Sequence, residues 1–407
     1  MPLRPTDEAL DEFLSRAVAR VIDRDDLRSL LAGGERRLRI KQGFDPTRPN
    51  LHLGHVVCLR KLRRFAEWGH EIVIIVGDWT TQIGDPTDRD ESRPTMSREQ
   101  VLENAATYLD QFHRVVPRQG VRIVYQNEWF GAFTLKDVIG LAARFTAQQM
   151  LAREEFRKRL AANAPIPIKD LLYPLLQAYD SVAIESDVEV GGTDQEFNVL
   201  VGRQLQGQVG QRPQNVFIVP LLEGLDGEKM SKSKPATAIW LTDTPEQVYG
   251  KVMAINDDLM PHYFEWATDV PMAEVRTTLD ALARRDLHPR DAKAALAHRI
   301  TSELHSSAGA DDAAAAFARQ FREHRAPAEA ELVTLERDGA GDITIVDVLV
   351  RAGLASSRSE ARRVVGQGGV RVDGRPADVS MAVRTQGEPL VQVGRRRSKR
   401  IRWVDSG

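Results

Sequence analysis

Two patterns of apolar positions alternate along the first half of the chain. Short runs rich in Val and Ile predict buried strands, whereas stretches with apolar residues every three or four positions predict amphipathic helices. Strands that alternate with helices are typical of a parallel α/β sheet. The expected strands are Leu38–Gly43, Glu71–Gly77, Gly120–Tyr125 and Asn215–Leu222, with helical patterns such as Val56–Trp68 and Met96–Val115 between them.

Two later stretches are helical throughout. Residues from about Thr134 to Ile184 look mostly helical, and we interpret them as an insertion between strands of the sheet. The pattern of Thr244–His324 is almost wholly helical and rich in Ala, and it begins with Pro245, which suits a first helical position. We therefore expect an all-α domain to follow the α/β domain.

The end of the chain forms a separate, smaller segment. Arg325–Glu331 lacks apolar periodicity and contains Pro327, which indicates a linker, and a compact α+β segment with glycine turns follows Asp342. The expected boundaries are 1–224 for the α/β domain with an insertion at about 130–184, 225–330 for a loop and the helical domain, 331–341 for the linker, and 342–407 for the last domain.

Composition narrows the class of protein. The 407 residues suffice for two or three domains, and 42% hydrophobic with 28% charged residues is an ordinary soluble mix. No apolar run approaches the roughly 20 residues that cross a bilayer, and the N-terminus lacks the apolar core of a signal peptide. Cys58 is the single cysteine, which excludes an intrachain disulfide and a cysteine-rich metal site. We expect a cytoplasmic protein.

Charge is distributed unevenly along the chain. Residues 351–407 carry 13 basic and 5 acidic side chains, a net charge of +8, whereas residues 1–350 carry 43 basic and 53 acidic side chains, a net charge of −10. A basic tail on an acidic body suggests a polyanion as the partner of the tail.

A candidate phosphate-binding loop follows the first expected strand. Residues 43–55 read GFDPTRPNLHLGH and lead into an expected helix. The backbone N–H groups at such a helix start attract anions, and Gly54 allows a ligand close to the backbone. His52 and His55 share one face of the helix start and, with the Thr47 hydroxyl, could donate hydrogen bonds to phosphate oxygens. Two histidines here could instead be surface or packing residues, or a metal pair, although no third ligand with suitable spacing follows.

A second loop is rich in lysine. Residues 227–234 read GEKMSKSK and follow an expected strand. A mobile loop carrying the ammonium groups of Lys229 and Lys232 could close over a triphosphate and neutralise charge on departing pyrophosphate. The plainer alternative is a solvated basic loop.

The two loops together resemble the signature motifs of class I aminoacyl-tRNA synthetases. His52–His55 is similar to the HIGH motif, Lys229–Ser233 matches KMSKS without a substitution, and their order is that of the family. The GFDPT lead-in resembles the tyrosyl branch. The resemblance implies a Rossmann-like catalytic domain, a helical anticodon-side domain, catalytic roles for His52, His55, Thr47, Lys229 and Lys232, and ATP contacts from Gly43, Asp45, Pro46, His52, Gly54, His55, Gly191, Gly192, Asp194, Met230, Ser231, Lys232 and Ser233.

A polar stripe marks a candidate amino-acid pocket. Tyr173, Gln177 and Asp180 fall on one face of a helix that is otherwise apolar, although a half-exposed helix would also explain the pattern. The stripe resembles the tyrosine-recognition helix of tyrosyl-tRNA synthetases. The resemblance implies that Asp180 accepts a hydrogen bond from the substrate phenol and that Tyr173 and Gln177, with Asp85, hold the ammonium group. Phenylalanine would leave the buried Asp180 carboxylate without its partner.

Residues 191–195, GGTDQ, offer paired glycines for close backbone approach, and Asp194 can bind ribose hydroxyls, although a plain turn would have the same composition. The resemblance implies that Gly191, Gly192, Asp194 and Gln195 contact ribose and tyrosine.

Lys41 departs from many members of the branch, which carry a tyrosine there that also touches the substrate phenol. The chain resembles more closely a second bacterial group with lysine at this position. Our hypothesis is that Lys41 pairs with Asp180 or approaches the phenol oxygen, and the alternative is that it points to solvent.

The basic segment near the C-terminus resembles the S4 RNA-binding domain. Its guanidinium groups suit phosphate oxygens, although a basic solvated face would look the same, and Trp403 is its lone aromatic residue suited to stacking. We therefore expect recognition of structured RNA through shape and phosphates. The candidate tRNA-binding residues are Arg358, Arg362, Arg363, Arg371 and Arg375.

The implied reaction joins tyrosine to ATP as tyrosyl adenylate, with release of pyrophosphate, and then transfers tyrosine to tRNA(Tyr). Positioning and charge stabilisation would suffice for it, with Mg²⁺ arriving with ATP, no protein metal site and no tightly bound cofactor.

Family members are homodimers through the inserted helices near 130–170. Three alternatives stay open: a tryptophanyl enzyme, an RNA-binding scaffold with a dead site, and another nucleotidyltransferase.

Overall fold

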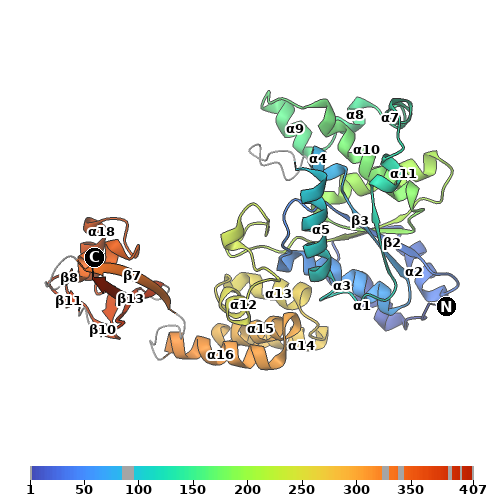
Figure 1. The fold of residues 1–407 in the computed structure, drawn as a ribbon. Helices are drawn as coiled ribbons and strands as arrows, with labels where there is room; N and C mark the ends of the chain where they lie inside the picture. The colour runs from blue at the N-terminus through green and yellow to red at the C-terminus, as the bar shows by residue number, and fades with distance from the viewer. Residues whose placement is uncertain are drawn as a thin grey trace. The chain divides into compact units, whose positions relative to one another are not determined.

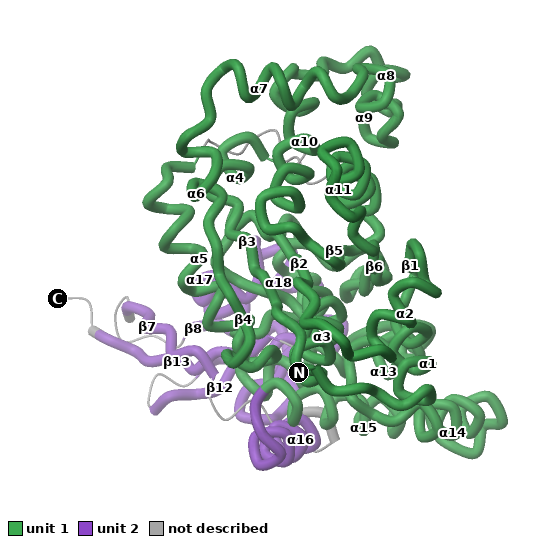
Figure 2. The backbone as a smooth tube through the Cα atoms, turned by 90° about the vertical axis from the view of Figure 1, so that its right-hand side faces the viewer, with its two compact units in different colours: residues 1–304 green, residues 305–407 purple. Residues whose placement is uncertain are grey.

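The computed structural model describes residues 2–84, 96–322, 330–337, 343–383, 387–394 and 397–405, which divide into two compact units, 1–304 and 305–407 (Figure 2). No helix among these residues is long and apolar enough to span a membrane.

A six-stranded sheet forms the centre of the first unit (Figure 1). Its order is β1-β6-β5-β2-β3-β4, and every neighbouring pair is parallel except β1 with β6. The expected α/β class is therefore confirmed, and the four expected strands are present within a few residues. The strands are β1 Arg20–Ile22, β2 Arg39–Phe44, β3 Glu71–Val76, β4 Val121–Tyr125, β5 Val188–Gly192 and β6 Asn215–Val219.

Helices cover both faces of this sheet. The helix α3 packs on β3 and β5, whereas α11 packs on β5 and β6 from the opposite face (Figure 1). The helices before the inserted segment are α1 Asp7–Ser15, α2 Arg24–Gly33, α3 Leu53–Glu67, α4 Thr80–Ile83 and α5 Arg98–Phe112. Between β4 and β5 lie α6 Asn127–Phe130, α7 Leu135–Ala142, α8 Ala147–Leu151, α9 Glu154–Ala161 and α10 Ile168–Ala183, as expected of a helical insertion, and α11 Glu196–Gln208 follows β5.

The stretch expected to be all-α is helical: α12 Pro245–Met253, α13 Met260–Ala267, α14 Met272–Ala283, α15 Pro289–Leu304 and α16 Ser307–Arg322. Thr244 caps α12 by accepting a hydrogen bond from the Gln247 N–H, and Pro245 is the first helical residue as predicted. The compact units do not divide at residue 224, because α12–α15 belong to the same unit as the sheet.

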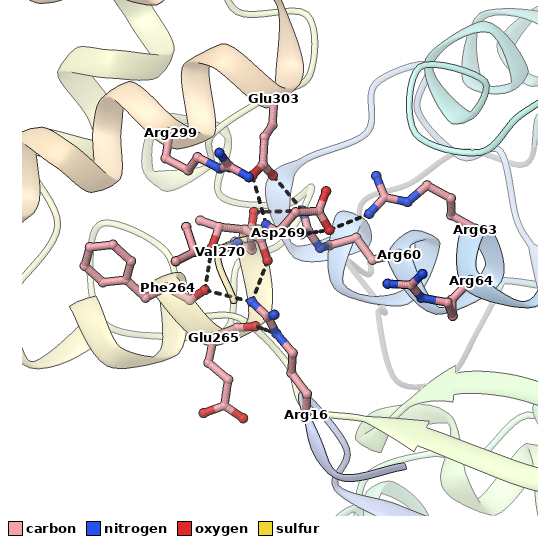
Figure 3. Close-up of polar contacts among 12 residues, drawn as sticks. Arg16, Arg60, Arg63, Arg64, Phe264, Glu265, Asp269, Val270, Arg299 and Glu303 are labelled. Atoms are coloured by element: carbon pink, nitrogen blue, oxygen red, sulfur yellow. Dashed lines mark hydrogen bonds and ion pairs between the residues drawn. The ribbon is translucent and has the colours of Figure 1, made fainter. Parts of the chain in front are cut away.

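Charged contacts fasten α3 to this helical part (Figure 3). Arg60 on α3 forms ion pairs with Asp269, which follows α13, and with Glu303 on α15, the latter at 2.8 Å. Arg16, which follows α1, donates to the backbone oxygens of Glu265 at 2.8 Å and Thr268 at 2.7 Å, near the C-terminal end of α13. A cation there satisfies carbonyls that have no partner within the helix. These contacts join α3 and the end of α1 to the helical part.

A five-stranded sheet with the order β10-β9-β12-β13-β7 organises the second unit. Its core includes Ile345, Leu349, Val370, Val391 and Ile401, all buried. The elements are β7 Glu331–Arg337, β8 Ile343–Thr344, α17 Ile345–Arg351, α18 Arg358–Gly366, β9 Val370–Val372, β10 Arg375–Pro376, β11 Ala382–Val383, β12 Leu390–Val393 and β13 Arg397–Asp405.

The expected linker at 331–341 is wrong for its first seven residues. Glu331–Arg337 form β7, which runs parallel to β13, and its Leu335 is buried in the core. The physical reason is that the partner strand comes more than 60 residues later, so the local pattern does not reveal the pairing.

Candidate active site

The site forms where the chain leaves β2 and β5. These strands are neighbours at the point where the sheet order reverses, and the connections after them diverge to opposite faces. A cavity of about 960 Å³ opens there. Of the candidate residues it is lined by Gly43, Asp45, Thr47, His52, Gly54, His55, Tyr173, Gln177, Asp180, Gly191, Gly192, Asp194, Gln195, Lys229, Met230, Ser231 and Lys232.

Four candidate residues are not among those that line it. Pro46 and Ser233 lie outside the lining, as does Lys41. Asp85 lies outside the described residues.

The two histidines lie together at the start of α3. His52 is its N-cap, and the ring centroids of His52 and His55 are 3.9 Å apart. Nδ1 of His55 lies 3.2 Å from the backbone nitrogen of His52 and 3.2 Å from its backbone oxygen, so the backbone of the N-cap residue holds the His55 ring in either tautomer. A side chain at Gly54 would bring a Cβ within 3.0 Å of His52 Nδ1, which explains the glycine between them.

Both rings are neutral at physiological pH. Burial lowers the pKa of His52 well below its usual value, and the neighbouring His55, Lys232 and Lys229 lower it further. Burial and the charge of Lys232 lower the pKa of His55 to about 3. The pair can therefore act as hydrogen-bond donors without changing charge.

The lysine loop closes the same cavity. The Met230 side chain is buried, and its backbone N–H donates to the Leu222 oxygen at 2.9 Å. The Lys232 ammonium lies 5.2 Å from the centre of the Tyr108 ring, in cation–π range. Lys229 forms an ion pair of 2.6 Å with Asp194 in the turn after β5. The histidine and lysine motifs, more than 170 residues apart in sequence, thus face one cavity.

Asp180, on α10, lines the same cavity. Its carboxylate accepts hydrogen bonds from Gln126 Nε2 at 2.9 Å and Trp129 Nε1 at 3.2 Å, and it is 2% exposed. Burial raises the pKa of Asp180 to about 7, against the lowering effect of the Lys41 charge. Sequence reasoning missed Gln126 and Trp129, because nothing in their local pattern points toward α10.

Tyr173 and Asp45 belong to one hydrogen-bonded group. The Tyr173 hydroxyl donates to Asp45 Oδ2 at 2.9 Å, and Thr80 donates to Asp45 Oδ1 at 2.6 Å. This group joins the loop after β2 to α10 and α4. Asp45, which was expected near ATP, lines the cavity, and its carboxylate is held by Tyr173 and Thr80.

Lys41 is fully buried, so the alternative that it points to solvent is wrong. The expected ion pair with Asp180 is also wrong, because the Lys41 ammonium pairs with Glu189 at 2.8 Å. Glu189 is the register partner of Lys41 on the adjacent strand, so its carboxylate is the one that neutralises the Lys41 ammonium. Glu189 lines the cavity and was not a candidate from the sequence.

Other lining residues were also missed. The Tyr108 ring stacks on Phe44 with a centroid distance of 3.7 Å, and Cys58 is a buried thiol whose pKa is raised by burial to about 12. Gln42 and Arg48 are further examples. Among the described residues no group of three His, Cys, Asp or Glu side chains is placed to hold a metal ion.

The candidate tRNA-binding arginines lie on α18 and the β9–β10 hairpin. Arg362 and Arg363 are exposed on α18, and Arg375 is exposed on β10. Arg358 forms an ion pair with Asp347 of α17, and Arg371 donates to the Gly374 oxygen at 3.0 Å. Arg362, Arg363 and Arg375 therefore present the more open guanidinium groups.

Two family models match most of the chain. The model for class I tRNA synthetases (W and Y) matches residues 34–322, and the S4 domain model matches residues 344–388. The chain belongs to the class I aminoacyl-tRNA synthetases, and an S4 domain follows the catalytic and helical parts in the sequence.

The curated relatives narrow this class. A tyrosine–tRNA ligase of Dehalococcoides mccartyi is 45% identical over 372 residues, which cover 91% of this chain and 93% of the relative. One of Thermotoga maritima is 44% identical over 398 residues, 97% of this chain and 98% of the relative. Within class I, the chain is a member of the tyrosine–tRNA ligases.

Solved structures support the fold. A tyrosyl-tRNA synthetase of Archaeoglobus fulgidus, complexed with L-tyrosine, superimposes with a TM-score of 0.61 at 21% identity, over 75% of this chain and 98% of that one. A truncated mitochondrial tyrosyl-tRNA synthetase of Aspergillus nidulans gives a TM-score of 0.62 at 23% identity, over 77% and 94%.

Proposed function

We propose that this cavity carries out both steps of tyrosine–tRNA ligation. The tyrosine carboxylate attacks the α-phosphorus of ATP, which forms tyrosyl adenylate and releases pyrophosphate. A terminal ribose hydroxyl of tRNA(Tyr) then attacks the carbonyl carbon of the adenylate and releases AMP. The single observation that carries the proposal is that His52, His55, Lys229 and Lys232 line the same cavity as Asp180.

The histidines and lysines act on phosphate charge. Neutral His52 and His55 donate hydrogen bonds to phosphate oxygens as negative charge shifts toward the leaving group, and Thr47 adds a hydroxyl. Lys229 and Lys232 neutralise the pyrophosphate. The glycines at the end of β5 leave room for the nucleotide near the backbone. A Cβ at Gly192 would lie 2.7 Å from the Asp194 carboxylate, so the glycine also leaves room for Asp194. Mg²⁺ enters with ATP, whose phosphate oxygens are its preferred ligands.

Asp180 selects tyrosine by accepting a hydrogen bond from the phenol hydroxyl. Its existing donors Gln126 and Trp129 hold the carboxylate in place for this contact. Tyr173, Gln177 and Gln195 line the same cavity, and we assign to them the ammonium and carboxylate groups of the amino acid. Asp85 is also proposed to hold the ammonium group, on the basis of the family motif alone.

The S4 domain binds tRNA through phosphate contacts. Its candidates are the exposed Arg358, Arg362, Arg363 and Arg375 and the half-buried Arg371. Guanidinium groups on a short helix and a hairpin suit the backbone of structured RNA.

Homodimerisation is proposed for the inserted helices. Leu135 and Ile139 of α7, Leu160 of α9 and Ile168 of α10 are 54–75% exposed. Large apolar side chains gathered in one exposed segment mark a protein interface.

We also place the reaction in the cytoplasm, where its tRNA product is used.

Exchange of labelled pyrophosphate into ATP tests the proposal. Exchange that requires L-tyrosine, is absent with L-tryptophan and does not need tRNA is expected, followed by charging of tRNA(Tyr). A chain that binds tRNA but gives no tyrosine-dependent exchange would contradict the catalytic assignment.

A further inference from the structure

A buried ion pair lies behind the proposed tyrosine pocket. Lys41 on β2 and Glu189 on β5 are register partners, and they are 0% and 2% exposed. Glu189 lines the cavity with Asp180, whereas Lys41 lies behind that lining. The pair thus stands at the centre of the sheet, between the strands whose ends form the site.

Every donor of the Lys41 ammonium has an acceptor. Its Nζ lies 2.8 Å from Glu189 Oε1, 2.7 Å from Ser181 Oγ and 3.0 Å from the Gln177 backbone oxygen. An ammonium group has three donors, so this set is complete. Two of the three acceptors belong to the turn of α10 that contains Asp180.

Glu189 is held from three directions. Besides Lys41, its carboxylate accepts from Ser181 Oγ at 3.0 Å and from Gln214 Nε2 at 2.5 Å. Ser181 therefore accepts from Lys41 and donates to Glu189, which makes a closed triangle of contacts. The triangle fixes α10 against β2 and β5 one residue beyond Asp180.

Stability alone is a weak reason for such a pair. Well-packed apolar residues of similar volume often stabilise a core as well as a buried ion pair does, although removal of one partner is costly. The geometry connects the pair to recognition instead, because the Lys41 ammonium binds Gln177 and Ser181 on either side of Asp180. In addition, the charge of Lys41 lowers the pKa of Asp180 and that of Glu189 raises it.

We propose that Lys41 and Glu189 are positioning residues for tyrosine recognition: their ion pair, closed through Ser181, holds the Gln177–Ser181 turn of α10 so that Asp180 faces the phenol. The inference rests on the proposed role of Asp180 as acceptor of the phenol hydroxyl. In this proposal Lys41 does not contact tyrosine directly, as the sequence hypothesis allowed, but affects tyrosine binding through its contacts with α10.

The groups that face Asp180 come from three elements. From β2 comes the charge of Lys41, and from β5 comes the charge of Glu189. From α6 and the residue before it come the neutral donors Trp129 and Gln126. The pH dependence of tyrosine binding should therefore respond to each member of the ion pair in a predictable direction.

The test is the pH profile of kcat/KM for tyrosine in pyrophosphate exchange, measured for Lys41→Met and Glu189→Gln. The acidic limb is the pH range over which kcat/KM for tyrosine falls as the pH drops. Lys41→Met should move this limb to higher pH by about one unit and raise the KM for tyrosine roughly tenfold at pH 7. The KM for ATP should be nearly unchanged. Glu189→Gln should move the limb to lower pH. A purely structural role would not shift the limb in opposite directions.

Controls separate folding from recognition. Lys61→Met removes another buried lysine, whose ammonium contacts backbone oxygens away from the cavity, and it should lower stability without moving the limb. If Lys41→Met does not fold, Ser181→Ala opens the same triangle and should raise the KM for tyrosine selectively.

Two failures can be told apart. A wild-type chain without tyrosine-dependent exchange would overturn the proposed function. An active wild-type chain whose acidic limb is the same in both charge variants, or moves the same way in both, would overturn only the role of the ion pair.

Discussion

Lys229 and Asp194 form an ion pair of 2.6 Å that joins the lysine loop to the turn after β5. The pair connects the group proposed to neutralise pyrophosphate with the group proposed to bind ribose. Both side chains are partly exposed, and such pairs contribute at most about 1 kcal/mol to stability. Its importance should therefore show in nucleotide binding rather than in folding.

Asp194→Ala should raise the KM for ATP roughly tenfold or more, because the variant cannot form a charge-assisted hydrogen bond to the ribose. Thermal unfolding should change little. Steady-state exchange kinetics and calorimetry give the two values. Asp226→Ala is the matched control, because Asp226 pairs with Lys234 in the same region but does not line the cavity. An unchanged KM for ATP in the Asp194 variant would remove Asp194 from the nucleotide site.

His55→Ala should lower kcat for exchange by about 10²–10³-fold with little change in the KM for tyrosine, because the missing donor acts on charge that develops in the transition state. His262, which is partly exposed and outside the cavity, provides the control substitution. Equal effects on kcat and on tyrosine binding would argue against this role.

The same histidines predict a pH dependence of stability. Their pKa values are lowered on folding, so between the lowered values and about 6.5 the unfolded chain binds more protons than the folded one. Stability should therefore fall as pH drops below about 6.5, and His55→Ala should weaken this dependence in urea titrations at pH 5 and pH 7. A dependence that is equally steep in the variant would contradict the buried neutral state of His55.

Asp180 should give the KM for tyrosine an acidic limb near pH 7. Its pKa is raised to about 7, so the carboxylate becomes protonated as pH falls and loses its ability to accept two donors and a phenol at once. Asp180→Asn should remove the limb and narrow the preference for tyrosine over phenylalanine. A limb that persists in the variant would belong to another group.

Arg362→Ala with Arg363→Ala should weaken tRNA charging while exchange stays at the wild-type rate. The salt dependence of charging should become less steep by about one unit of slope for each phosphate that the variant no longer neutralises. Arg284→Ala, an exposed arginine of the first unit, is the control. Charging that keeps its affinity and its salt slope would exclude these arginines from the tRNA interface.

The sequence predicted those parts whose signal is local. The apolar runs placed β2, β3, β4 and β6, and the two motifs placed His52 and Lys232 in one site. β5 was not predicted, because only Val188 and Val190 of its five residues are apolar and the strand ends in the glycines of the nucleotide turn.

The rest depends on contacts between distant segments. Gln126 and Trp129 reach Asp180 only because α6 lies beside α10 in the folded chain, and Glu189 takes the Lys41 charge because β5 pairs with β2. Such partners are set by the order of strands in the sheet, which no local pattern specifies.

The parallel pairing of β7 with β13 bears on how the protein can be divided experimentally. A chain cut after residue 341 would retain β7 without its neighbour and leave Val333 and Leu335 without the core that they pack against. An unpaired strand edge of this kind favours aggregation. Fragments meant to isolate the adenylate-forming part should therefore stop before Glu331, and an autonomous RNA-binding fragment should begin there.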